Sequence, residues 1–182
     1  GLGIDLLGDG VTANDLDDSD TGPNFLQNSP SAMGVTISGS EVHVTYQVSS
    51  SELNSVYDMT VQFYEADASG QGERFLGELP WTLADLQAGA PRRRALGSAF
   101  DLGLTEGASV VATVTDGAGN TSEFSPVDTV TTGPLTVVTT EDGGDYGSLR
   151  AALDYALANG GGEIFFDPSV AGRLKLNSLL PN

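Results

Sequence analysis

The chain of 182 residues contains no cysteine, so it can form neither a disulfide framework nor a thiolate metal site, and it offers no cysteine nucleophile. It has only seven Lys plus Arg against 25 Asp plus Glu. The resulting formal charge of -18 would repel nucleic acid backbones and anionic membrane surfaces. No apolar run approaches the roughly 18 residues that span a bilayer. We therefore expect no nucleic acid partner and no membrane insertion in this segment.

What the chain does contain is typical of a turn-rich β protein: 24 glycines, many Thr, Ser, Asp and Asn residues, and a hydrophobic content of 39%. Charge is unevenly distributed, because the first basic residue is Arg74 and 12 acids precede it. Cations are the expected counterpart of that acidic half. No signal peptide pattern opens the sequence, so an export signal, if there is one, is expected outside this stretch.

Strand and turn patterns dominate residues 32–132. Val42, Val44, Tyr46 and Val48 alternate with polar residues, which predicts a half-buried strand over 41–48. Further strands are expected at 33–38, 57–66, 74–79, 95–102, 109–115 and 121–127, with a short helical turn at 82–87. This number of short strands in about 100 residues predicts a two-sheet β-sandwich of the immunoglobulin-like kind.

The two ends have a different texture. Residues 1–31 are rich in Gly, Asp and Asn with scattered apolar positions, so they cannot close a core alone and must dock on something. After Gly133-Pro134, strands are expected at 135–140, 163–166 and 173–176. Between them Ser148 is a good N-cap for one short amphipathic helix near 148–159. Its expected apolar stripe consists of Leu149, Ala152, Leu153, Ala156 and Leu157.

Several motifs resemble large bacterial surface proteins of the adhesin type that contain parallel β-helix repeats and an immunoglobulin-like domain. Gly-Leu-Gly-Ile-Asp-Leu at 1–6 and Asp-Thr-Gly-Pro-Asn at 20–24 resemble the exit from a β-helix. Residues 111–125 are similar to the closing hairpin of bacterial immunoglobulin-like modules. Residues 135–167, with Gly-Ser-Leu-Arg-Ala-Ala-Leu at 147–153, look like the N-terminal cap of a β-helix.

The resemblance implies a mainly β chain with three parts: an acidic β-helix exit and linker over 1–31, an immunoglobulin-like sandwich over 32–132, and the cap and first coil of a following parallel β-helix over 133–182. It implies a non-catalytic structural or adhesive module at the bacterial cell surface. Flanking domains or neighbouring copies would be its partners, together with glycans or cell-surface proteins. The alternatives are a subunit of an extracellular filament and a carbohydrate-binding or ancillary part of a polysaccharide-processing β-helix protein.

The acid-rich stretch after Gly8 is a candidate Ca²⁺ site, because closely spaced hard oxygen ligands are what Ca²⁺ selects. The candidate ligands in this stretch are Asp9, Asp15, Asp17, Asp18, Ser19 and Asp20. An EF-hand would need Gly where Asp20 stands and Glu where Leu26 stands, so the stretch is not an EF-hand. The alternative is a solvated acidic linker.

A second pair of candidate calcium ligands, Asp116 and Asn120, lies in the turn Asp-Gly-Ala-Gly-Asn. The pair is similar to acidic loop residues at inter-domain calcium sites in bacterial adhesin modules. The same residues are also preferred in plain hairpin turns, and this alternative stays open.

The remaining features indicate structure rather than chemistry, and no catalytic residue is expected. The glycines at 143, 144 and 147 lack the lysine and full spacing of a phosphate-binding loop. The basic cluster at 92–94 predicts an exposed loop or edge strand, with docking to an acidic neighbour as the alternative. His43 is expected on a polar strand face, and Trp81 is expected to anchor the core or a loop rather than stack on a sugar.

Overall fold

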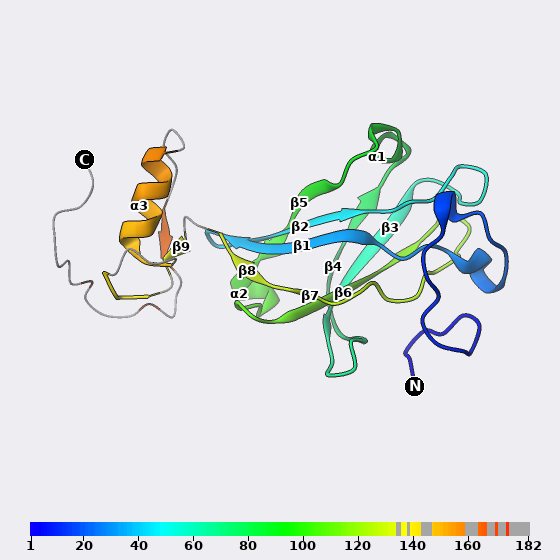
Figure 1. The fold of residues 1–182 in the computed structure, drawn as a ribbon, viewed down its shortest axis with the longest axis horizontal. Coiled ribbons are helices and arrows are strands. Elements are labelled where there is room, and N and C mark those ends of the chain that lie inside the picture. The colour runs from blue at the N-terminus through cyan, green and yellow to red at the C-terminus, as the bar shows by residue number, and fades with distance from the viewer. Residues whose placement is uncertain are drawn as a thin grey trace.

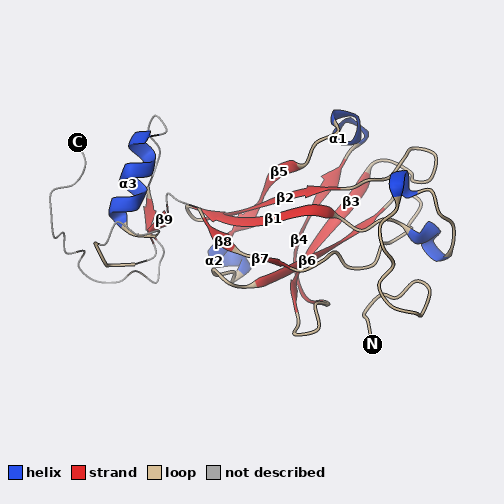
Figure 2. Ribbon diagram, in the orientation of Figure 1, coloured by secondary structure: helices blue, strands red, loops and turns tan. Residues whose placement is uncertain are grey.

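The computed structural model describes residues 1–133, 136–137, 139–142, 147–158, 164–166, 170 and 174. The described part of the chain is mainly β, as expected, and its centre is formed by two four-stranded sheets with the orders β5-β2-β1-β8 and β4-β3-β6-β7 (Figures 1 and 2). The strands of the two sheets are β1 (Ser31–Ser38), β2 (Glu41–Gln47), β3 (Met59–Ala66), β4 (Gly72–Trp81), β5 (Arg92–Ser98), β6 (Ser109–Thr115), β7 (Asp128–Thr129) and β8 (Thr131–Thr132).

Apolar alternation places the core between the two sheets. In β2 the side chains of Val42, Val44 and Tyr46 are buried while their neighbours are not, which confirms the predicted strand. Tyr46 contacts the ring of Phe63 from β3 in the other sheet at a centroid distance of 5.4 Å. Trp81 is fully buried and lies 5.8 Å from the Tyr46 ring, so its expected role as a core anchor is confirmed.

All neighbouring strands except one pair are antiparallel within the two sheets, and the exception is the parallel pairing of β1 with the two-residue strand β8. The basic cluster Arg92-Arg93-Arg94 opens β5, an edge strand, as predicted. Between β4 and β5 the helix α1 (Leu83–Ala88) occupies the expected helical turn. It is started by a capping box in which Thr82 and Asp85 exchange hydrogen bonds.

One strand prediction was wrong and another was confirmed only in its first half, and in both cases side-chain hydroxyls explain the difference. Residues 121–127 form only an isolated bridge to β6, because the hydroxyls of Ser122 and Ser125 take the hydrogen bonds of the β6 amides at Val114 and Ala112. The strand expected at 95–102 ends at Ser98, whose side chain caps the short helix α2 (Ala99–Leu102).

The C-terminal part contains the predicted helix as α3 (Leu149–Ala158), and Ser148 Oγ accepts a hydrogen bond from the Ala151 amide as an N-cap does. Of the expected apolar stripe, Ala152 and Ala156 are buried, whereas Leu157 is exposed. The strands expected at 135–140 and 163–166 are present as the short parallel pair β9 (Thr136–Val137) and β10 (Phe165–Phe166). Of the strand expected at 173–176 only residue 174 is described, and the glycines at 143 and 144 lie outside the described residues. Within the described ranges, every helix falls short of the length and apolarity required to cross a membrane.

Candidate metal site

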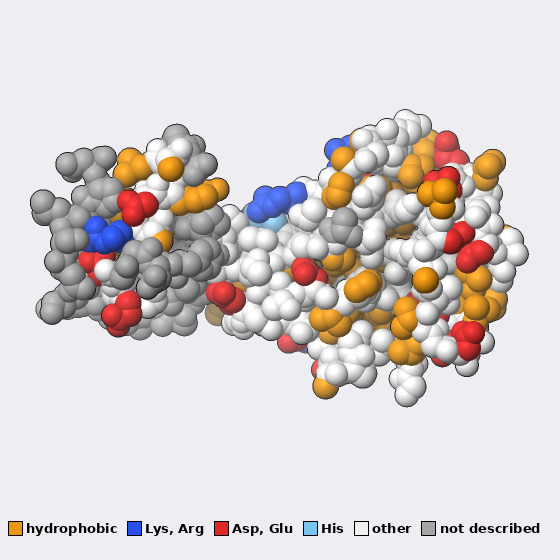
Figure 3. All heavy atoms as spheres, in the orientation of Figure 1, with side chains coloured by type: hydrophobic (Ala, Val, Ile, Leu, Met, Phe, Trp, Pro, Cys, Tyr) orange, Lys and Arg blue, Asp and Glu red, His pale blue; other side chains and the backbone are white. Residues whose placement is uncertain are grey.

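Three carboxylates converge in the acidic loop that precedes the first sheet. Asp15, Asp18 and Asp20 each place one carboxylate oxygen so that these oxygens lie within 4.8 Å of one another. The loop contains the short 3-10 turn η1 (Leu16–Asp18) and is followed by a second one, η2 (Pro23–Leu26). Figure 3 shows acidic side chains interspersed with hydrophobic ones over this end of the two-sheet unit. The acidic triad, as we call Asp15, Asp18 and Asp20, could hold a metal ion.

The loop adopts its shape because aspartate tolerates left-handed backbone and can bond to nearby amides. Asp17 and Asp18 have φ values of 59° and 57°. The carboxylate of Asp15 accepts hydrogen bonds from the amide and the hydroxyl of Ser19, at 3.0 and 2.9 Å. The side chain of Asn28 holds the start of the loop, accepting from the Asp15 amide at 2.9 Å and donating to the Asp15 carbonyl at 3.0 Å.

Asp18 fastens the loop to the protein body. Its side chain is only 1% exposed, and Oδ1 accepts from the Asn28 amide at 2.8 Å. Oδ2 accepts from the side chains of Gln27 and Ser50 at 2.8 and 2.5 Å, and more distantly from Ser55. The Asp17 carbonyl accepts from the Ser51 amide, so backbone also joins the acidic loop to the segment 49–55. Asp18 is therefore held in place by neutral donors.

The electrostatics of the triad favour a cation. Burial raises the pKa of Asp18, although hydrogen bonds from Ser50 and Asn28 act in the opposite direction. Partial burial and the negative charges of Asp15 and Asp18 raise the pKa of Asp20. The Oδ1 atom of Asp20 is buried without a hydrogen-bond partner, and in the described part of the chain no ion pair with Lys or Arg reaches the triad. A bound cation would relieve this repulsion and give the orphaned oxygen a partner.

The other ligands expected in this stretch lie outside the triad. Asp9 is exposed and precedes the loop. The side chain of Asp17 is also exposed. The Ser19 hydroxyl donates a hydrogen bond to the Asp15 carboxylate. Whether Asp9, Asp17 or Ser19 completes a coordination shell stays a prediction.

Asp116 and Asn120 lie together in the turn after β6, separate from the acidic triad. The Asp116 carboxylate accepts from the amides of Val56, Ala118 and Asn120 at 3.0, 2.9 and 2.8 Å, and from the Asn120 side chain at 3.1 Å. Burial acts to raise the pKa of Asp116, but these bonds outweigh it and lower the pKa. The carboxylate therefore closes the turn and ties it to Val56, which is what the hairpin alternative requires. Calcium binding by this pair stays a prediction.

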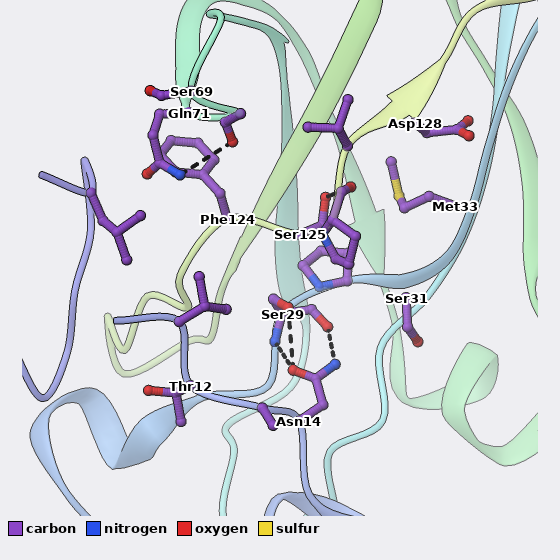
Figure 4. Close-up of a pocket in the computed structure, with 17 residues that line it drawn as sticks. Thr12, Asn14, Ser29, Ser31, Met33, Ser69, Gln71, Phe124, Ser125 and Asp128 are labelled. Carbon is purple, nitrogen blue, oxygen red and sulfur yellow. Dashed lines mark hydrogen bonds between the residues drawn. The ribbon is translucent and has the colours of Figure 1, made fainter. Parts of the chain in front are cut away.

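The second notable feature is a groove of about 600 Å³, which sequence reasoning missed. Figure 4 shows it between the N-terminal segment, the β3–β4 hairpin, residues 124–128 and the beginning of β1. The groove could not be found from the sequence, because four segments far apart along the chain form its walls.

The neutral donors around Asp18 were missed for the same reason, since Ser50 and Ser55 lie more than 30 residues away from the carboxylate that they bind.

Comparisons with known proteins give no relative: no protein-family model matches the chain, and no curated protein matches it. The triad could hold a metal ion, and the groove is a hollow of about 600 Å³.

Proposed function

We propose that the chain is a non-catalytic structural and adhesive module of a large secreted or cell-surface bacterial protein. In this proposal residues 32–132 are an immunoglobulin-like β-sandwich, and the segments 1–31 and 133–182 are the end of one parallel β-helix and the cap of another. Ca²⁺ bound at the acidic triad stiffens the junction between the linker and the sandwich. The observation that carries the proposal is the acidic loop, clamped through buried Asp18 to the segment 49–55 at one end of the sheets.

The two-sheet core supports the sandwich. Side chains from both sheets share one hydrophobic cluster, and the antiparallel pairings dominate, as in sandwiches of the immunoglobulin kind. The short α3 helix with its β9–β10 pair is the kind of element that the β-helix cap requires.

Calcium rather than a softer metal suits the site, since its ligands are carboxylate oxygens and the chain has no cysteine. Extracellular fluids contain enough calcium to load a site of ordinary affinity, so the ion would stabilise the folded module by mass action. A loop that joins two domains gains most from such a clamp, because its own apolar contacts are few.

The buried carboxylates support a non-catalytic role. Asp18, Asp85, Asp116 and Glu123 are each at most 5% exposed, and each accepts at least three hydrogen bonds from the protein. None of the four lines the groove. Their acceptor capacity is used to hold loops in place, which leaves these four carboxylates poorly suited to act as a general acid or base.

The proposal is tested by thermal melting with and without calcium. At a calcium concentration 100 times the dissociation constant, binding adds about 2.7 kcal/mol to the free energy of unfolding. For a unit of roughly 130 residues this raises Tm by about 10 °C. Magnesium should give a smaller rise, because it demands stricter octahedral geometry and gives up its water reluctantly.

The informative variant is Asp20→Asn, because the Asp20 oxygen has no partner to lose. Without calcium this variant should melt at the same temperature as the parent or higher, since repulsion within the triad is reduced. With calcium it should lose most of the rise in Tm. Asp101→Asn removes one exposed charge in α2, away from the triad, and serves as the matched control. An equal calcium response in the parent and in Asp20→Asn would contradict the proposed site.

A further inference from the structure

The groove beside β1 has a lining suited to an extended chain. Apolar side chains alternate in its walls with hydroxyl and amide side chains (Figure 4). The N-terminal wall is fixed to the body by hydrogen bonds: the Gly3 amide donates to Gln71 at 2.7 Å, and Asn14 is bonded to Ser29 in both directions. The groove is thus a formed feature of the surface.

One wall of the groove is an open sheet edge. The neighbour of β1 on this side, β8, pairs only with Thr36 and Ile37. Along 31–34 no strand lies on that side in the described part of the chain, and Ser31 and Met33 line the groove there. The facing segment 125–127 is not a strand, and Pro126 has no amide hydrogen to offer. An unpaired edge next to an apolar groove is the arrangement by which sheets capture extended peptides.

The negative charge in the groove favours a partner that carries a basic side chain. Asp128 is the single charged residue among the 17 that line it. Its Oδ2 atom accepts from the Val35 amide at 2.7 Å, while Oδ1 accepts no hydrogen bond within the described part of the chain. A lysine or arginine of a partner can bond to this oxygen, and the formal charge of -18 favours the approach of a basic partner.

A sugar is a poorer fit, because the aromatic ring in the groove is already covered. Added Cβ atoms at Gly72 and Gly3 would lie 2.6 and 3.3 Å from the Phe124 ring, so backbone packs closely on it at both positions. Tyr64 also contacts this ring at a centroid distance of 5.6 Å and an interplanar angle of 88°. Little ring face remains for a sugar to stack on.

We propose that the groove binds an extended segment of a partner protein in which apolar residues alternate with lysine or arginine. The segment runs along the open edge of β1 at 31–34, its apolar side chains contact Met33 and Pro126, and one cationic side chain binds Asp128. This inference deepens the adhesive part of the proposed function and rests on it. It does not depend on calcium, because the acidic triad and the groove share no lining residue.

The test is an NMR titration of the whole chain with a blocked pentapeptide of alternating valine and lysine. Amide signals of Ser31, Met33 and Gly34 should shift on binding. Asp128→Asn should weaken the affinity about fivefold, the size expected for one half-exposed ion pair, and it leaves an acceptor for the Val35 amide, so the fold is kept. Asp101→Asn should bind the peptide as the parent does.

Two control ligands complete the titration: the matching pentapeptide of valine and glutamate, and cellotetraose as a neutral sugar. Neither should shift the groove signals at the same concentration. Equal binding of the acidic peptide, binding of the sugar alone, or shifts confined to other surfaces would overturn the inference. Run in calcium and in EDTA, the titration separates the two proposals. A calcium-dependent rise in Tm without peptide binding overturns the groove alone, and peptide binding without a calcium response overturns the metal site alone.

Discussion

Asp85→Asn should be among the most damaging single-atom changes in this protein. The Asp85 carboxylate is 5% exposed and accepts hydrogen bonds at 2.8 to 2.9 Å from Arg92, Arg94 and both the amide and hydroxyl of Thr82. Arg94 also donates to Tyr46 Oη, at 2.7 Å. The network ties α1 and the edge strand β5 to the core. An amide at position 85 would leave two half-buried guanidinium groups without a counter-charge.

The size of the effect follows from the pKa of Asp85. Burial raises this pKa, but hydrogen bonds from Thr82 and Arg94 outweigh burial and lower it from 3.8 to about 2. The gap corresponds to about 2.5 kcal/mol of stability at neutral pH. Since the folded pKa lies below the unfolded one, this contribution is complete above about pH 4 and is lost as the pH falls through 2.

Urea unfolding at several pH values between 7 and 2 measures this effect. Asp85→Asn should lose about 2 to 3 kcal/mol at pH 7, and the difference from the parent should shrink toward zero near pH 2. Glu65→Gln is the matched control, because the Glu65–Arg74 pair is exposed at 36% and 45% and should contribute less than about 1 kcal/mol. A loss at pH 7 no larger than that of Glu65→Gln, or a difference that persists at pH 2, would refute the reasoning.

Two further predictions concern the packing of β4 on Phe124 and the docking of the N-terminal segment. Gly72→Ala should cost about 1 to 3 kcal/mol in urea unfolding, because the new Cβ would lie 2.6 Å from the Phe124 ring. Gly34→Ala is its control, since the nearest atom there is Thr45 Cβ at an ordinary 3.6 Å; equal costs would contradict the packing. Glu123→Gln should speed amide exchange at Leu6 and Thr12, whose amides donate to the Glu123 carboxylate, while the amides of β3 keep their protection. Unchanged exchange at both amides would show that other contacts hold the segment.

The centre of the fold could be predicted because its signal is local. Strict alternation over 41–48 located β2, and the same period located β3 near 57–66. Both strands bury one face against the opposite sheet, so each apolar position in the sequence indicates a side chain that faces the core. The N-cap at Ser148 likewise predicted the start of α3, since capping depends on residues within one turn.

Predictions failed where a side chain replaced the backbone in a hydrogen-bond pattern. The apolar and polar residues of 121–127 predicted a strand. The amides of Ser122 and Ser125 do donate to β6 carbonyls, but their hydroxyls, in place of backbone carbonyls, accept from the β6 amides. At Ser98 a hydroxyl started a helix inside an expected strand. Serine supports a strand, a cap or an irregular bridge with similar energy, and tertiary context decides among them.

The candidate site shows the same division between local and distant information. The density of carboxylates located the acidic loop, but it selected Asp9, Asp17 and Ser19 together with Asp15, Asp18 and Asp20. The sequence could not show which of these acids would be buried. Asp18 is held by Gln27, by Ser50 and by other donors that lie far from it in the sequence. The groove is less accessible still to sequence reasoning. Asp128, its single charged residue, lies beside the edge of a strand that begins almost 100 residues earlier, and this proximity cannot be predicted from the sequence.

The contrast between the core and the acidic loop bears on how the module would respond to its surroundings. The core between the sheets is held by apolar burial, which salt and calcium change little. The loop is held by hydrogen bonds to a buried carboxylate whose pKa burial has raised, so its stability depends on what neutralises that charge. Acid would do so by protonation, and a cation by coordination. Calcium should therefore tighten the junction at neutral pH while leaving the core unaltered, and its effect should fade as acid protonates the same oxygens.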